Sequence, residues 1–319
     1  MRAENPLISI VIPLWNEAQI VPELARRLQA LDGLNLEVVC VDDGSSDETA
    51  EQLECVLPAF SRWKLVKLSR NFGQQSAFRA GLDEATGDAV IFLDADLQDP
   101  PELIPEMVAA WQNGAKLVVA CRSSRAERGL RRVCFDLFHR VFHRITGGIM
   151  PKDSGTFGLM DKAVADQLRR LPEQNLFLPA LRSWVGYRQV CVWYDRSSRV
   201  GQPKQRFGRL LSYAWDGVTS FSAVPLKFIS AAGILLSLIG FGYAGVLLVI
   251  KFLQFFGYFA SLEVPGFTTV AVAVFCIGGL QLICTGIIGE YLARVYTEVK
   301  RRPHYIVESI SSSAPEDAT

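Results

Sequence analysis

Two aspartates separated by one residue follow an apolar run and have the chemistry of a metal site. Residues 89–93 are apolar and predict a buried β-strand. Asp94 and Asp96 come directly after it, and Gln98 lies two residues further along. Two carboxylates this close repel each other unless a positive charge lies between them. Carboxylate and amide oxygens bind Mg²⁺ or Mn²⁺, so we predict a divalent-metal site with open positions for phosphate. Because Asp-x-Asp is a common pattern, the alternative interpretation is a polar turn after a strand.

Other polar clusters also follow apolar, strand-like runs. Strands are predicted at residues 7–12, 36–41, 64–68, 89–93, 117–121 and 190–194. Helical patterns lie between the first five of them. A further short strand is predicted to end at Met160. The early strands are followed by Asn16 and Glu17, by Asp42 and Asp43, by Arg70 and Asn71, and by Arg122. Strands that alternate with helices predict a mostly parallel α/β sheet, covered by helices on both faces, with ligands bound beyond the carboxyl ends of the strands. Polar residues confined to that edge indicate a nucleotide site.

Composition excludes some classes of function. The chain has 319 residues, and its 33 Lys and Arg residues balance its 33 Asp and Glu residues, so nothing indicates nucleic-acid binding. The N-terminal apolar stretch is short and contains Pro13, so no signal peptide is expected. The seven cysteines form no CxxC pair. Because Cys40, Cys121 and Cys191 lie in strand-like runs, we predict buried free thiols in a reducing compartment.

Two long apolar runs near the C-terminus predict a membrane hairpin. Residues 226–253 carry a lysine near each end and no charge between, and residues 265–289 carry no charge. Each run exceeds the roughly 20 residues that cross a bilayer as a helix, so two transmembrane helices are predicted. Basic residues cluster outside the pair, at Lys204, Arg206, Arg209 and Lys227 before it and at Arg294, Lys300, Arg301 and Arg302 after it. The positive-inside rule then places both termini in the cytoplasm.

Arginines also mark two segments of the first part of the chain. Residues 128–146 have apolar residues at helical spacing and five arginines on the remaining positions. This segment is interpreted either as a core-packed helix with a basic face or as a helix on an anionic membrane surface. Arg122 and the basic loop at 196–206 offer donors for a second phosphate. A domain with a predicted metal site, joined to membrane helices, indicates a transfer reaction in which the activated donor is soluble and the acceptor is a lipid.

Several motifs together carry a family resemblance. They are Val11-Ile-Pro-Leu-Trp-Asn-Glu17, Val41-Asp-Asp-Gly-Ser-Ser-Asp47, Leu68-Ser-Arg-Asn-Phe-Gly73, Leu93-Asp-Ala-Asp-Leu-Gln-Asp-Pro-Pro-Glu102, Trp184-Val-Gly-Tyr-Arg188, Pro225-Leu-Lys227 and Gly289-Glu-Tyr-Leu-Ala-Arg-Val-Tyr296. The sequence resembles the family 2 glycosyltransferases, and most of all the polyisoprenyl-phosphate glycosyltransferases such as the bactoprenol glucosyltransferases. The similarity covers nearly the whole chain.

This resemblance implies a GT-A fold and a reaction. A sugar, with glucose as the first expectation, would pass with inversion from a UDP-sugar to undecaprenyl or another polyprenyl phosphate, at the cytoplasmic face of a bacterial inner membrane. Mg²⁺ or Mn²⁺ would be the cofactor, and a homotetramer is expected. The implied domains are a GT-A domain at 1–205, a juxtamembrane segment at 206–225, a two-helix transmembrane hairpin at 226–296 and a cytoplasmic tail at 297–319.

The resemblance also implies roles for individual residues. Pro13, Trp15, Glu17, Asp42, Asp43 and Asp94 would bind the nucleotide sugar; Asp94, Asp96 and Gln98 the metal; and Arg122, Arg131, Arg199 and Lys204 the acceptor phosphate. Asp94, Asp96, Asp153 and Arg199 would be catalytic.

One position departs from the family pattern. Bactoprenol glucosyltransferases carry a proposed catalytic aspartate in a turn where this sequence has Thr156, and Asp153 lies three residues earlier. We expect an active enzyme, because a phosphate monoester with a second pKa near ~6 is already mostly ionised at neutral pH. The alternative is a nucleotide-sugar-binding membrane scaffold with impaired turnover. A processive polysaccharide synthase is disfavoured, because the Gln-x-x-Arg-Trp signature and additional membrane helices are lacking.

Overall fold

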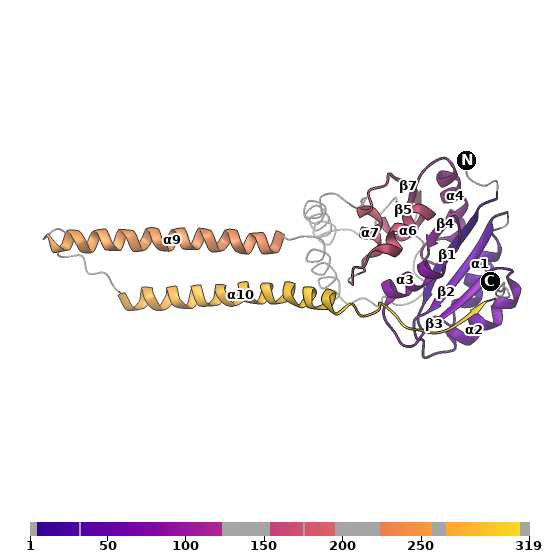
Figure 1. Cartoon of the computed structure of the whole chain (residues 1–319), viewed down its shortest axis with the longest axis horizontal. Helices are drawn as coiled ribbons and strands as arrows, with labels where there is room; N and C mark the ends of the chain where they lie inside the picture. Colours follow the sequence, from indigo (N-terminus) through magenta and orange to yellow (C-terminus); the bar gives the residue numbers. More distant parts are fainter. Residues whose placement is uncertain are drawn as a thin grey trace. The chain divides into compact units, whose positions relative to one another are not determined.

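The chain divides into two compact units, and each is described by itself. The computed structural model describes residues 5–31, 33–122, 154–174, 176–194, 224–256 and 266–312. One unit comprises residues 1–207 and 302–319, and the other comprises residues 208–301 (Figure 1). The first unit is an α/β structure and the second contains long helices.

The α/β unit is built on one mixed sheet. Its described strands are β1 (Leu7–Leu14), β2 (Asn35–Asp42), β3 (Trp63–Leu68), β4 (Ala89–Phe92), β5 (Leu117–Arg122), β6 (Ser154–Asp161), β7 (Gln189–Tyr194) and β8 (Val307–Ser312). They lie in the order β7-β5-β6-β4-β1-β2-β3-β8. β1 to β4 are parallel to one another, and so are β5 and β7, whereas β6 and β8 are antiparallel to their neighbours. The predicted mostly parallel sheet is confirmed.

The central strands are apolar at nearly every position, so both faces of the sheet are apolar and helices cover both. The core cluster on one face joins Ile8, Ile10 and Ile12 of β1 to α1 (Val21–Gln29), α2 (Thr49–Val56) and α4 (Ile104–Gln112). Between these elements lie the 3₁₀ helices η1 (Leu57–Ala59) and η2 (Pro101–Leu103), and elsewhere in the unit are α3 (Gln74–Glu84), α6 (Lys162–Arg170) and α7 (Leu178–Trp184). On the other face α3 lies so close to β1 that a Cβ on Gly81 would lie 2.2 Å from Val11 Cγ1.

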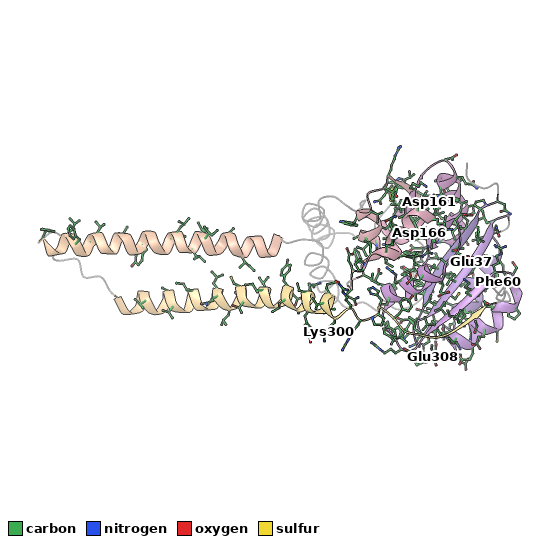
Figure 2. All side chains as sticks on the ribbon, in the orientation of Figure 1. Glu37, Phe60, Asp161, Asp166, Lys300 and Glu308 are labelled. Carbon is green, nitrogen blue, oxygen red and sulfur yellow. A yellow bond between two sulfur atoms is a disulfide. The ribbon has the colours of Figure 1, made fainter. Side chains whose placement is uncertain are left out.

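The last described strand was not predicted from the sequence. β8 pairs antiparallel with β3 and forms one edge of the sheet. The preceding residues are held as well, because the Tyr305 hydroxyl donates to Asp83 Oδ2 at 2.8 Å and Ser69 N donates to Ile306 O at 3.0 Å. Glu308, labelled in Figure 2, lies on β8 and is exposed. A charged residue on an edge strand opposes pairing with other chains.

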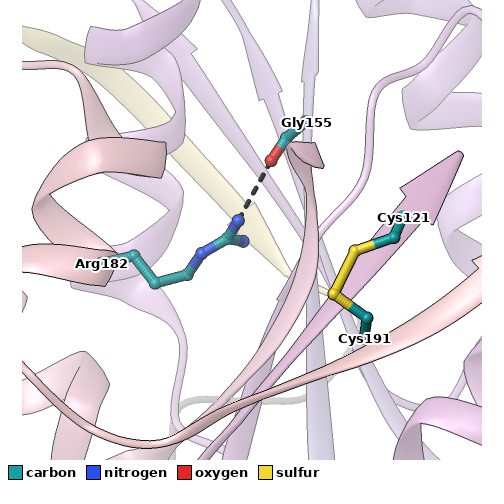
Figure 3. The surroundings of a disulfide bond; sticks show 4 residues. All are labelled: Cys121, Gly155, Arg182 and Cys191. Atoms are coloured by element: carbon teal, nitrogen blue, oxygen red, sulfur yellow. Dashed lines mark hydrogen bonds between the residues drawn. A yellow bond between two sulfur atoms is a disulfide. The ribbon is translucent and has the colours of Figure 1, made fainter. Parts of the chain in front are cut away.

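The prediction for the cysteines is only partly right. Cys40 is buried and free, as expected. Cys121 of β5 and Cys191 of β7 instead form a disulfide (Figure 3), with their Cα atoms 5.7 Å apart. The prediction of free thiols at these two positions is therefore wrong. In the parallel register Val119 lies opposite Cys191 and Cys121 lies opposite Trp193, so the two cysteines are diagonal neighbours on adjacent strands. Sequence alone does not place these two strands side by side.

The second unit contains two long helices that contact each other. α9 (Val224–Phe255) has 32 residues and α10 (Gly266–Lys300) has 35. Judged on the residues that are described, neither helix is both long enough and apolar enough to cross a membrane. The prediction of two helices in this region is confirmed, and their insertion into a bilayer stays a prediction. The basic segment 128–146 lies outside the described residues.

Candidate active site

A buried aspartate joins three loops at the carboxyl edge of the sheet. Asp43 follows β2 and is 2% exposed. Its amide donates to Leu14 O at 2.9 Å, and its carboxylate accepts hydrogen bonds from the amides of Phe72 (2.7 Å) and Gly73 (2.9 Å). Burial raises the pKa of Asp43 above its ordinary value, although both amides favour the charged form. Asp43 therefore fixes the loop between β3 and α3 against the ends of β1 and β2.

The loops after β1 and β2 also hold each other. Asn16 N donates to Ser45 Oγ at 3.0 Å, and Asn16 Oδ1 accepts from Ser46 N at 2.8 Å. Gly44, with φ of +65°, packs so closely on the next loop that a Cβ would lie 2.5 Å from the carbonyl carbon of Arg70. This close approach explains why glycine follows the two aspartates.

The predicted nucleotide-binding residues therefore occupy one edge. Pro13 is buried in β1, Trp15 just beyond it is 49% exposed, and the Glu17 amide donates to Thr49 Oγ1 at 2.9 Å. Asp42 is buried and accepts from Ser45 N at 3.1 Å, and burial raises its pKa. The exposed indole of Trp15 offers a stacking surface for a base, whereas Pro13 and Asp42 are buried.

The predicted metal-binding residues follow β4 in a tight turn. Leu93 N still donates to Val11 O at 3.0 Å, and the chain leaves the sheet after it. Asp94 Oδ1 accepts from the side-chain amide of Gln74 at 2.7 Å, and Asp96 Oδ1 accepts from Gln98 N at 3.2 Å. Leu97, between Asp96 and Gln98, has a positive φ of 54°, which is uncommon for a residue other than glycine. Both carboxylates are half-buried.

These residues fit a hard divalent cation that is completed by substrate. Within the described residues no Lys or Arg forms an ion pair with Asp96. Also within the described part of the chain, no three His, Cys, Asp or Glu side chains gather as a metal cluster. Asp94 and Asp96 offer two carboxylates, and Mg²⁺ is commonly held by one or two carboxylates together with substrate phosphates.

Two side chains that the sequence analysis missed, Tyr194 and Asp99, form a third group with the predicted Arg122. Tyr194, at the end of β7, donates its hydroxyl hydrogen to Asp99, which is 1% exposed. Arg122, at the end of β5, has Nε 3.4 Å from the Tyr194 hydroxyl oxygen and Nη2 4.0 Å from Asp99 Oδ1. Burial and the bond to Asp99 raise the pKa of Tyr194 to about 12. The only available signal was Asp99 itself, in the same acidic stretch as Asp94 and Asp96.

Arg122, predicted to bind the acceptor phosphate, lies within the electrostatic influence of Asp94, predicted to bind the donor and the metal. Burial alone would lower the pKa of Arg122, but Tyr194 and the charges of Asp99 and Asp94 raise it. Asp94 is also joined to α3 through Gln74. Thr156 lies on β6 and is half-buried. The remaining predicted site residues, Arg131, Asp153, Arg199 and Lys204, lie outside the described residues.

Fold and sequence together define the class of protein. The sheet resembles that of glucosyl-3-phosphoglycerate synthase from Mycobacterium tuberculosis, solved with Mn²⁺, UDP and phosphoglyceric acid, with a TM-score of 0.51 and 18% identity over 67% of this chain and 76% of that chain. This likeness shows a GT-A-like α/β fold.

The family follows from the sequence matches. The model of glycosyl transferase family 2 matches residues 9–169, and the chain belongs to this family of enzymes. An uncharacterised glycosyltransferase of Synechocystis sp. is 43% identical over 308 residues, covering 95% of each chain. A prophage-derived bactoprenol glucosyl transferase of Shigella flexneri is 37% identical over 313 residues, covering 97% of this chain and 99% of its own. The resemblance to family 2 glycosyltransferases is thus confirmed.

Proposed function

We propose that this glycosyltransferase moves glucose from UDP-glucose to a polyprenyl phosphate such as undecaprenyl phosphate. The observation that carries the proposal is that the acidic segment after β4 contacts both α3 and Arg122. Asp94 Oδ1 accepts from the Gln74 side-chain amide at 2.7 Å, and Asp99 Oδ1 lies 4.0 Å from Arg122 Nη2. A metal held by the carboxylates would neutralise a leaving diphosphate, and Arg122 would bind an attacking phosphate. The similarity to bactoprenol glucosyl transferases supports the choice of acceptor.

The donor would bind across the ends of β1, β2 and β4. Trp15 offers its exposed ring to the uracil, and Asp43 keeps the 72–73 loop in place beneath the ribose. Asp94, Asp96 and Gln98 would hold Mg²⁺ or Mn²⁺, which when bound would neutralise charge on the diphosphate. The manganese and UDP in the fold relative support this choice of ligands.

The acceptor would bind on the Arg122 side. The planar guanidinium suits a phosphate, and Asp99 with Tyr194 fixes its direction. A phosphate oxygen attacks the anomeric carbon, the bond from that carbon to the UDP oxygen breaks, and UDP leaves. No base is required, because the monoester is already ionised at neutral pH. Arg122 therefore orients the nucleophile rather than deprotonating it.

We further propose that α9 and α10 hold the protein in the bacterial inner membrane, with the catalytic unit in the cytoplasm. The apolar sequence of residues 226–253 and 265–289 and the basic residues that flank it support this orientation. Large apolar side chains on both helices are exposed, with Leu238 at 65% and Leu282 at 75%. Exposed apolar surface on this scale indicates contact with lipid or with other helices.

The test uses the full chain purified in detergent. It is incubated with UDP-glucose, undecaprenyl phosphate and Mn²⁺, and the lipid product is identified by mass. We expect a glucosyl lipid that disappears with EDTA, and a loss of about 10²-fold or more in rate for Asp96→Asn. The matched control is Asp88→Asn, at the opposite end of β4, where Asp88 Oδ2 accepts from Leu7 N at 3.0 Å. Full turnover by Asp96→Asn would overturn the metal assignment, and product only from another nucleotide sugar would overturn the choice of donor.

A further inference from the structure

A fully buried arginine on α7 lies behind the acceptor side of the site. Arg182 is 1% exposed, and burial lowers its pKa to about 10. Its Nη1 donates to Thr156 O at 3.1 Å, and its Nη2 donates to Gly155 O at 3.0 Å (Figure 3). Among the described residues its Nε has no hydrogen-bond partner and no carboxylate forms an ion pair with it. Burying a charge against neutral carbonyls is costly.

Two glycines of β6 show how tightly this guanidinium is seated. A Cβ on Gly158 would lie 2.3 Å from Arg182 Nη1, so no other residue fits there beside the arginine. A Cβ on Gly155 would lie 3.3 Å from Arg122 Nη2. Gly155 therefore accepts a hydrogen bond from Arg182 at its carbonyl oxygen, and its vacant side-chain position faces Arg122 Nη2. A side chain at Gly155 would displace the Arg122 guanidinium by a few tenths of an ångström.

We propose that Arg182, acting through Gly155, is a positioning residue that sets where the Arg122 guanidinium meets the acceptor phosphate. The inference rests on the proposed function, which assigns Arg122 to that phosphate. Arg122 Nε lies 3.4 Å from the Tyr194 hydroxyl oxygen, and Nη2 lies beside Gly155, where an added Cβ would be 3.3 Å away. A planar group with neighbours at both ends keeps one orientation, which a bidentate contact to phosphate requires. The hydrogen bond from Arg182 to Gly155 O fixes the main chain at that second point.

Gly155→Ala is the sharpest test, because among the described residues the new methyl group meets only Arg122 Nη2 within 4 Å. Gly155 is not among the glycines with positive φ, so alanine is not strained there. Displacing the guanidinium by a few tenths of an ångström should raise the KM for undecaprenyl phosphate about three- to ten-fold and leave the affinity for UDP-glucose unchanged. Arg182→Met should act in the same direction, and Arg182→Lys should restore part of the effect.

Two controls separate positioning from general destabilisation. Arg79 on α3 is also a buried arginine that donates to a main-chain carbonyl, Leu168 O at 2.9 Å. Arg79→Met should lower the unfolding temperature without changing the KM for the lipid. In an Arg122→Ala background, Gly155→Ala should have no further effect on that KM.

The outcomes distinguish this inference from the function on which it rests. If Arg122→Ala raises the KM for the lipid while Gly155→Ala and Arg182→Met lower only the unfolding temperature, the positioning role is wrong and the function stands. If Gly155→Ala raises that KM equally with and without Arg122, the effect does not pass through Arg122 and the inference is also wrong. If Arg122→Ala leaves the KM unchanged, the acceptor role of Arg122 fails and this inference fails with it.

Discussion

Tyr194 donates its hydroxyl hydrogen to Asp99 across the end of the sheet, from the edge strand β7 to the segment that follows β4. The two residues are 95 positions apart in the chain. Both are buried, at 8% and 1% exposure. This contact therefore connects an edge strand to the acidic segment that carries the candidate metal ligands.

Removing the hydroxyl should cost stability. Tyr194→Phe leaves the buried Asp99 carboxylate without that donor, so the free energy of unfolding should fall by about 1–3 kcal/mol. Urea unfolding of the full chain in detergent measures the change. Tyr187→Phe is the matched control, because Tyr187 is 36% exposed and its hydroxyl should contribute little. Equal stability of the two variants would show that the contact with Asp99 is not stabilising.

The same hydroxyl predicts a loss of stability at alkaline pH. Burial and Asp99 raise the pKa of Tyr194 from 10.0 to about 12 in the folded protein. A raised pKa contributes stability below the unfolded value of about 10, and that contribution is lost as pH rises through about 12. The difference in unfolding free energy between wild type and Tyr194→Phe should therefore shrink between these pH values. A difference that stays constant up to pH 12 would contradict the prediction.

Glu37 lies near the amino-terminal end of β2, and it predicts that the protein loses stability in acid. Burial raises its pKa, but hydrogen bonds from Ser9 and Thr86 outweigh burial, so that the pKa lies below its ordinary value of 4.5. A lowered pKa contributes stability above about pH 4.5 that is lost as pH falls through the folded value. Glu37→Gln should therefore flatten the decline of stability below pH 4.5, as followed by thermal unfolding. Glu51→Gln, on the exposed side of α2, should leave that decline unchanged.

Thr156 predicts that the family aspartate is dispensable here. Its carbonyl accepts from Arg182, and its side chain is half-buried on β6. Because the acceptor phosphate is already ionised, Thr156→Asp should change kcat by less than about ten-fold and could lower it by repelling that phosphate. Initial rates with saturating lipid provide the measurement. A gain of 10²-fold or more would instead favour an impaired scaffold, whose turnover an aspartate restores.

The disulfide predicts a measurable cross-link between β5 and β7. Cys121 and Cys191 are 70 residues apart in sequence. Closing a loop of that length stabilises a protein by about 4.4 kcal/mol in the chain-entropy model. Non-reducing peptide mapping should yield a linked pair of peptides, and reduction should lower the unfolding temperature. Cys55, which is free and exposed, is the internal control for alkylation. Alkylation of Cys121 and Cys191 without prior reduction would show that the thiols are free.

Much of the architecture could be predicted from local patterns. The apolar runs of β1 to β5 are long enough and punctuated clearly enough to identify each strand, and a parallel sheet then places Asp43, Asp94 and Arg122 at one edge. The antiparallel insertion of β6 between β4 and β5 could not be predicted in this way, because strand order depends on long-range packing. The pairing of β7 with β5 is also a long-range contact, and it brings Tyr194 to Arg122 and Cys191 to Cys121.

Side chains whose role depends on a contact with a distant part of the chain were the hardest to predict. Arg182 resembles an ordinary helix arginine in the sequence, and only its burial against Gly155 and Thr156 distinguishes it. Tyr194 closes an apolar run and resembles a core residue until its hydroxyl is placed beside Asp99. Contacts between residues that are far apart in the chain leave no periodic signal.

Pairing of β8 with β3 affects the order in which the sheet can be completed during protein synthesis. β8 follows α10 in the chain, so the ribosome makes both long helices before the strand that covers β3. Until then the edge of β3 presents unpaired amides and carbonyls, which attract strands of other chains. Completion of the sheet in the catalytic unit therefore depends on synthesis of the helical segment. In a chain released at residue 301, the edge of β3 would stay unpaired.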